Sequence, residues 1–318
     1  MKAVSYIFGP IPSRRLGRSL GVDIIPKKLC TLDCIYCELG RTDKRALRRK
    51  EYVPTNDVIA QVKSFLADHE GIDVITFSGS GEPTLHSGLG SMIGALKEWT
   101  STPVAVITNG TLLYREDVRH DLLEADIVLP SLDAATEKTF MAINRPHPRL
   151  HLAAIVEGLK QFRREYRGQL WVEVLFVEGV NDSNEETQRM RDILEDIGPD
   201  KVQLNTVLRP PADRSAHPLS EERLHRLEGF FGNRSEVIGR YHPSGGKKDS
   251  VIRDSEVIAV LRRRAMTLRE LEQSLEAPPK AVLISLLSLV RDERVFSFVY
   301  LGKKYYQAFE SLGDALSV

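Results

Sequence analysis

Residues 73–83, DVITFSGSGEP, predict a buried strand that opens into a glycine loop. The strand is indicated by its run of β-branched and apolar residues, and the loop by two glycines and a closing proline. Residues 55–69, TNDVIAQVKSFLADH, precede this strand and predict a helix with Thr55 or Asn56 as its cap. A helix followed by a buried strand is the unit from which α/β folds are built.

The same unit recurs along the chain as far as residue 210. Further helices are predicted around 88–99, 115–124, 149–166 and 184–196. Further strands are predicted in PVAVITNGT (103–111), DIVLPSLDA (126–134), QLWVEVLFVEG (169–179) and KVQLNTVLRP (201–210), and IIP (24–26) is interpreted as the end of an earlier strand. This alternation predicts right-handed crossovers and a parallel sheet, closed into a partial or complete (β/α) barrel.

The alternation is expected to stop at residues 211–250, where only one helix is predicted, near 219–231. SGGKKDS (244–250) has the composition of a linker. Beyond it, three short helices and a hairpin turning at Gly302 indicate a small winged-helix-like α+β domain. We therefore expect a barrel domain over residues 1–245 and a second domain over 250–310.

Composition and charge set the class of protein. The 318 residues carry 44 basic and 44 acidic side chains, and no apolar run reaches the roughly 20 residues that span a bilayer. The first residues do not have the pattern of a secretory signal, so we expect a soluble, cytoplasmic protein without a membrane partner. Residues 1–50 hold twelve Lys or Arg and four Asp or Glu, which suggests an anionic group nearby, with an ordinary solvated face as the alternative.

All three cysteines of the chain, Cys30, Cys34 and Cys37, lie in LCTLDCIYCELGRT at 29–42. Three clustered cysteines in a reducing compartment favour a metal site over disulfides. Thiolates suit zinc, copper(I) and iron–sulfur clusters. Structural zinc usually has four protein ligands, and here only a distant histidine such as His86 could complete the set.

The Cys-x3-Cys-x2-Cys spacing, together with SGSGEPTL at 78–85, resembles the radical S-adenosylmethionine (radical SAM) superfamily. The resemblance implies a partial (β/α)6-type TIM barrel and a [4Fe–4S] cluster in the loop at 30–37. Three irons would be held by the cysteines, and the fourth would be chelated by the amino and carboxylate groups of S-adenosyl-L-methionine. Over residues 5–210 the chain also resembles Fe–S oxidoreductases related to the wyosine-base synthases of transfer RNA.

Several residues match positions that contact the cosubstrate in this superfamily. Tyr36 matches an aromatic position near the adenine, with plain loop packing as the alternative. In the glycine loop the candidates are Gly79, Gly81 and Glu82, of which Gly81 and Glu82 would bind the methionine amino group. The remaining candidates lie at or beyond predicted strand ends: Asn109, Ser131 and Asp133 for ribose and methionine, Arg145 for the carboxylate, and Asn205 and Arg209 for the substrate. Helix capping is the alternative for Ser131 and Asp133, and a surface ion pair for Arg145.

The implied reaction is reductive cleavage of S-adenosylmethionine, which gives a 5′-deoxyadenosyl radical that removes hydrogen from a substrate. The substrate stays open between an RNA nucleoside, a protein or peptide, and a small metabolite. An electron donor such as flavodoxin or ferredoxin is implied as a partner. A second cluster held by cysteines is not expected, because the chain has no further cysteine.

Two alternatives remain open: a glycyl-radical activase, and a non-enzymatic Fe–S regulator whose winged helix binds DNA. The expected recognition helix, PPKAVLISLLSLVRDER at 278–294, offers few side chains that read bases, so we do not expect specific DNA binding. LRRRAMTLRE at 261–270 still supplies a small basic patch that could contact RNA phosphates.

Overall fold

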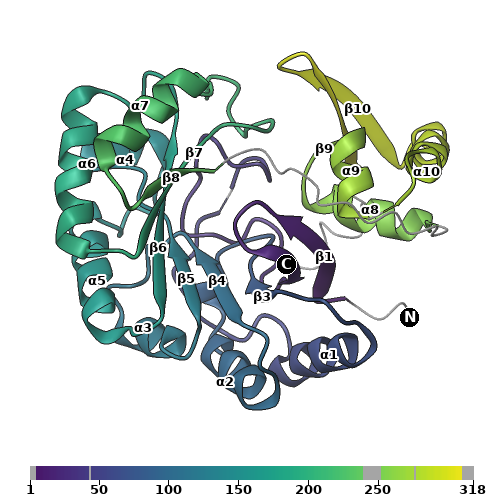
Figure 1. The fold of residues 1–318 in the computed structure, drawn as a ribbon, viewed down its shortest axis with the longest axis horizontal. Helices are drawn as coiled ribbons and strands as arrows, with labels where there is room; N and C mark the ends of the chain where they lie inside the picture. The colour runs from purple at the N-terminus through teal and green to yellow at the C-terminus, as the bar shows by residue number, and fades with distance from the viewer. Residues whose placement is uncertain (1–4, 43, 239–251, 276, 310–318) are drawn as a thin grey trace.

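The computed structural model describes residues 5–42, 44–238, 252–275 and 277–309. Its larger unit is built on one eight-stranded sheet whose strands lie side by side in chain order (Figure 1). The first two strands are antiparallel, and every later pair is parallel. The strands are β1 Ile7–Ser13, β2 Gly17–Val22, β3 Val74–Phe77, β4 Val104–Thr108, β5 Ile127–Pro130, β6 Gln169–Phe176, β7 Lys201–Thr206 and β8 Ser235–Val237.

Helices connect the parallel strands and form the outer layer around the curved sheet (Figure 1). They are α1 Thr55–Asp68, α2 Leu89–Trp99, α3 Glu116–Leu122, α4 Glu137–Ile143, α5 Leu152–Glu165, α6 Asn184–Ile197 and α7 Glu221–Phe231, with a short 3-10 helix η1 at Pro83–Leu85. The parallel strands β3, β4, β5 and β7 are largely buried on both faces, which explains why they appear in the sequence as nearly continuous apolar runs. The α/β barrel expected from these runs is confirmed.

The barrel is open. No ladder joins β8 to β1 among the residues that the structure describes. The sequence prediction missed both edge strands, and the expectation that the alternation stops at 211–250 is wrong, because α7 and β8 continue it. β8 has three residues, too few to show a period of two. The helix α4 was missed as well, since its seven residues make only two turns.

Two predicted boundaries at the N-terminal side are also wrong. β2 ends at Val22, so IIP at 24–26 lies beyond the strand. α1 begins at Thr55, and Pro54 rather than Thr55 or Asn56 holds the cap position. The Thr55 N–H donates to Glu51 Oε1 at 2.8 Å, so a side chain from before the helix serves its first turn.

The C-terminal unit contains three helices and a three-stranded antiparallel sheet, which confirms the winged-helix-like arrangement. Its elements are α8 Asp254–Arg263, β9 Met266–Thr267, α9 Leu268–Ser274, α10 Pro279–Arg291, β10 Val295–Tyr300 and β11 Lys303–Ala308. The hairpin turns at Leu301 and Gly302, both with positive φ, as the glycine predicted. The predicted linker at 244–250 lies outside the described residues.

The C-terminal unit packs beside β1 (Figure 1). The Arg263 guanidinium lies over the Phe8 ring, 4.1 Å from its centroid, and its Nε is 3.7 Å from Asp23 Oδ2. Tyr305 donates its hydroxyl to the Leu208 carbonyl at 3.4 Å. Within the described ranges, no helix has the length and apolar character that a membrane crossing requires.

Candidate metal centre

The cysteine loop follows β2 and is fixed by backbone hydrogen bonds to distant segments. Ile35 N donates to the Ile143 carbonyl at 2.9 Å, and Ala46 N to the Cys30 carbonyl at 2.9 Å. The buried Asp33 carboxylate accepts from Thr42 N at 2.6 Å. These contacts tie the cysteine loop to the rest of the barrel.

Each cysteine sulfur has one side-chain N–H donor. The contacts are Lys28 Nζ to Cys37 Sγ at 3.3 Å, Asn109 Nδ2 to Cys30 Sγ at 3.4 Å and Asn144 Nδ2 to Cys34 Sγ at 3.4 Å. All three thiols are free. Burial raises the pKa of Cys30 to about 12 and holds that of Cys34 well above its ordinary value. Thiols of this kind ionise when a metal replaces the proton.

The arrangement fits an iron–sulfur cluster better than a single ion. In the described part of the chain, no three His, Cys, Asp or Glu side chains are arranged around one metal position. A cluster does not require this, because each cysteine binds a different iron. His86 is not brought to the sulfurs: its Nδ1 accepts from Gly88 N at 3.0 Å, and its Nε2 lies 3.0 Å from the Val53 carbonyl oxygen. Iron–sulfur clusters are bound by cysteine thiolates and are tuned by hydrogen bonds to the sulfurs. The three cysteines and their N–H donors fit this chemistry.

Glu82, which was expected to bind the methionine amino group, accepts four hydrogen bonds from the protein. Oε1 accepts from Thr84 N at 3.0 Å, Thr84 Oγ1 at 2.6 Å and Thr108 Oγ1 at 2.5 Å, and Oε2 accepts from Asn109 N at 2.7 Å. Glu82 is 2% exposed. Glu82 therefore ties the loop after β3 to the end of β4, and only Oε2 retains a free acceptor position.

The two glycines of this loop are explained by close contacts within the protein. Gly79 has φ +137, and a Cβ there would lie 2.5 Å from the Asp23 carboxyl carbon. A Cβ on Gly81 would lie 2.3 Å from the Leu29 carbonyl oxygen, one residue before Cys30. Gly81 is thus needed for the cysteine loop to approach the β3 loop.

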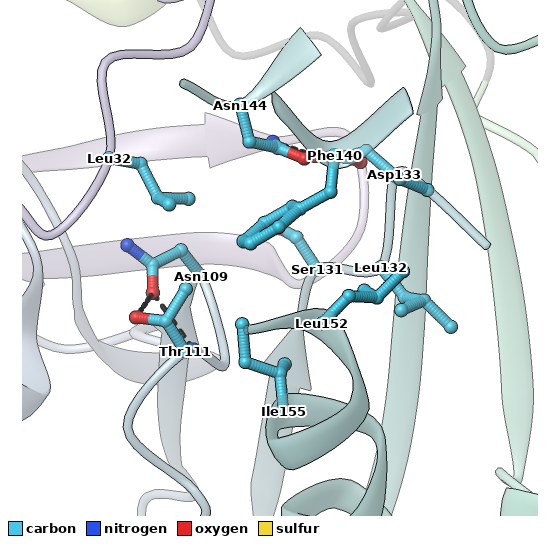
Figure 2. A pocket seen from close by; sticks show the side chains of 11 residues that line it. Leu32, Asn109, Thr111, Ser131, Leu132, Asp133, Phe140, Asn144, Leu152 and Ile155 are labelled. Carbon is cyan, nitrogen blue, oxygen red and sulfur yellow. Dashed lines mark hydrogen bonds between the residues drawn. The ribbon is translucent and has the colours of Figure 1, made fainter. Parts of the chain in front are cut away.

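The polar candidates at the strand ends lie around one pocket beside the sulfurs. Figure 2 shows two hydrogen-bonded pairs in its wall, Asn144 with Asp133 and Asn109 with Thr111. The lining consists of Leu32, Asn109, Thr111, Ser131, Leu132, Asp133, Ala134, Phe140, Asn144, Leu152 and Ile155. Thr136, and neither Ser131 nor Asp133, holds the N-cap position of α4, the helix that follows them. Asn109 and Asn144 each contact both this pocket and a cysteine sulfur.

Asp133 is the centre of a buried network in this wall. Tyr36 donates its hydroxyl to Asp133 Oδ2 at 2.5 Å, and Asn144 Nδ2 donates to the same oxygen at 2.8 Å. Leu175 N donates to the other oxygen at 2.9 Å. Burial raises the pKa of Asp133 to about 6, although these donors lower it. Tyr36 is thereby oriented by a carboxylate, which goes beyond plain loop packing.

The remaining candidates are engaged in ion pairs or polar pairs. Arg145, with φ +43, donates from Nη2 to Asp213 Oδ2 at 2.6 Å, while its Nη1 is buried without a partner. Asn205 Nδ2 donates to Glu173 Oε1 at 2.8 Å, and Arg15 Nη2 donates to the same oxygen at 2.6 Å. Lys28 and Asn144 were not predicted as site residues. Asn144 lies directly before Arg145 in INRPHP, and this neighbouring candidate is the sequence signal that could have indicated it.

Comparisons with known proteins agree with this geometry. A family model described as "Radical SAM superfamily" matches residues 24–190. A UPF0026 protein of Methanocaldococcus jannaschii is 38% identical over 239 residues, 74% of this chain and 73% of that protein. A protein of Brachyspira hyodysenteriae named GTPase Obg is 38% identical over 303 residues, 94% of this chain, and the chain spans only 45% of its length.

A solved radical SAM methyltransferase from Sphaerobacter thermophilus shares the fold, with a TM-score of 0.53 at 19% identity, covering 69% of this chain and 66% of that one. The narrower relation to wyosine-base synthases stays a prediction. Because the family match extends over more than half of the chain and includes the cysteine loop and the β3 loop, this protein belongs to the radical SAM superfamily, whose enzymes use a [4Fe–4S] cluster and S-adenosylmethionine.

Proposed function

We propose that this enzyme cleaves S-adenosylmethionine reductively and abstracts hydrogen from a substrate that is not yet identified. The observation that carries the proposal is the set of three sulfurs, each with its own N–H donor, next to a pocket with polar and apolar walls. Cys30, Cys34 and Cys37 would hold the cluster. When bound, the cluster and cosubstrate supply the electron and the 5′-deoxyadenosyl radical.

The chain's own residues prepare the site in two ways. Lys28, Asn109 and Asn144 donate to the sulfurs and stabilise negative charge there. Apolar side chains on the pocket wall exclude water from the reacting atoms; they are Leu32, Leu132, Phe140, Leu152 and Ile155.

Glu82 and Asp133 act as positioning residues in this proposal. Glu82 holds the Asn109 backbone, so the Asn109 amide reaches both the Cys30 sulfur and Thr31 Oγ1, the latter at 2.8 Å. Asp133 holds Tyr36 and Asn144 in the same way. Ser131 and Arg145 remain candidate contacts for the cosubstrate.

The proposal includes a one-electron donor such as flavodoxin or ferredoxin, and an RNA or a protein or peptide as substrate. The cytoplasm is the proposed location. We also propose that the barrel unit extends over residues 1–245 and the winged-helix-like unit over 250–310, in line with the separate apolar core of the latter.

The test is anaerobic reconstitution of the full chain with iron and sulfide, followed by S-adenosylmethionine and dithionite. We expect 5′-deoxyadenosine, and an electron paramagnetic resonance signal that changes when the cosubstrate is added. Cys37→Ala should lose iron and product, whereas Ser274→Ala, a small buried residue of the other unit, should retain both. Retention of zinc, or a signal indifferent to S-adenosylmethionine, would contradict the proposal.

A further inference from the structure

Three arginines from distant parts of the chain lie close enough to repel one another where the two units are in contact. Arg14 lies in the turn between β1 and β2, Arg209 follows β7, and Arg264 follows α8. We call them the arginine cluster. Arg209 is well partnered: Nη1 is 3.2 Å from Glu38 Oε2, and Nη2 is 3.0 Å from Glu270 Oε1. It joins the loop after Cys37 to the C-terminal unit.

Arg14 and Arg264 differ from Arg209 because neither forms a hydrogen bond or ion pair within the described part of the chain. Both side chains are only partly exposed. The nearest carboxylates are already used, since Glu38 and Glu270 bind Arg209 and Glu173 binds Arg15. The arginine cluster therefore carries one more positive charge than the two glutamates that it faces.

This surplus has an electrostatic cost. Burial, together with the positive charges of Arg209 and Arg14, lowers the pKa of Arg264 to about 10, although Glu38 and Glu270 raise it. Burial, Arg209 and Arg15 likewise lower the pKa of Arg14. None of the nitrogens of Arg14 and Arg264 is among the buried side-chain atoms that lack a partner, so both guanidinium groups are accessible to an anion, which would offset the surplus positive charge.

The position of the arginine cluster connects it to the candidate metal centre. Glu38 is the residue directly after Cys37, and it binds Arg209 and lies close to Arg14 and Arg264. A ligand held by these guanidinium groups would therefore lie beside the cysteine loop. Arg264 belongs to the C-terminal unit, so both units would contribute to its binding.

We propose that Arg14 and Arg264 bind a phosphate group of the substrate, while Arg209 remains paired with Glu38 and Glu270. A guanidinium donates two parallel N–H bonds to two oxygens of one phosphate, and a phosphate has enough oxygens for two such groups. The phosphate belongs either to a nucleotide or to an RNA backbone. The inference depends on the proposed function only in treating the ligand as the substrate.

Equilibrium binding to the anaerobically reconstituted full chain tests this site without any turnover. The probes are inorganic phosphate, uridine monophosphate and a short oligouridine without a terminal phosphate. We expect the monophosphate to bind and to raise the melting temperature, with affinity reduced at least about tenfold in Arg14→Gln and Arg264→Gln, as for loss of a charge-assisted hydrogen bond. Arg262→Gln, which removes an exposed charge two residues from Arg264, should bind as the parent does.

Comparing the oligouridine with the monophosphate distinguishes an RNA backbone from a nucleotide as the source of the phosphate. An RNA ligand should bind more tightly than the monophosphate, and its affinity should decline with salt by about 0.7 in log K per log unit of salt for each phosphate contacted. A nucleotide ligand shows the reverse preference.

Structural damage and ligand loss are distinguishable in the same variants. Without phosphate, Arg264→Gln should melt no lower than the parent, because it removes an unpaired charge. Binding of no probe, or equal weakening in Arg262→Gln, would overturn the inference. Because the readout is binding, phosphate binding without formation of 5′-deoxyadenosine would overturn the proposed reaction and leave this site standing.

Discussion

Replacement of Glu82 distinguishes a structural role for this carboxylate from a role limited to binding the cosubstrate. Glu82→Ala leaves the buried N–H groups of Thr84 and Asn109 without an acceptor, whereas the two hydroxyls can rotate toward others. Each orphaned N–H costs about 1–3 kcal/mol, so the free energy of unfolding should decrease by about 2–6 kcal/mol. Glu82→Gln retains an oxygen that accepts from Thr84, but its NH2 group then faces the Asn109 N–H, which loses its acceptor. We therefore expect the free energy of unfolding to decrease by about 1–3 kcal/mol.

The measurement is denaturant unfolding of the cluster-free chain, monitored by tryptophan fluorescence. Both tryptophans, Trp99 on α2 and Trp171 on β6, lie in the barrel, so the signal follows that unit alone. Glu98→Ala, an exposed change on α2, should alter stability by less than about 0.5 kcal/mol. If both Glu82 variants behave like Glu98→Ala while binding of S-adenosylmethionine is lost, the carboxylate serves the cosubstrate only and our reasoning is refuted.

Three further predictions follow from other contacts. Arg15→Met leaves the buried Glu173 carboxylate without its guanidinium and should lower the free energy of unfolding by about 3–5 kcal/mol. The double change Arg15→Met, Glu173→Met should lower it by less, and equal decreases would contradict a buried pair. Gly81→Ala, whose Cβ would meet the Leu29 carbonyl, should destabilise by about 1–3 kcal/mol and lower iron content, whereas Gly229→Ala, in open space on α7, should stabilise by about 0.5–1 kcal/mol in the same fluorescence assay. Asn144→Leu removes the N–H donor to Cys34 and should make the reduction potential of the reconstituted cluster more negative in a redox titration; an unchanged potential would show that this contact does not tune it.

The strands that form the site can be predicted from the sequence, because each is a buried apolar run followed by small or polar residues. Asn109, Ser131 and Asp133 were expected near one another since parallel strands end at one edge, and the structure places all three around one pocket. Asn144 cannot be predicted in the same way. It follows the missed helix α4, and its contact with Cys34 depends on how that helix packs against the cysteine loop.

The C-terminal unit shows why an element's type does not determine its role. As a winged helix it suggested nucleic-acid reading through α10, but that helix exposes Leu283, Ile284 and Leu287, which cannot read bases. Two charged side chains of the C-terminal unit contact the barrel instead, Arg263 at Asp23 and Glu270 at Arg209. Sequence spacing cannot show these contacts, because each joins residues that are more than 60 positions apart in the chain. Of the basic run at 261–270, Arg264 lies close to Glu38, the residue after Cys37, so a phosphate bound at Arg264 would lie beside the cysteine loop.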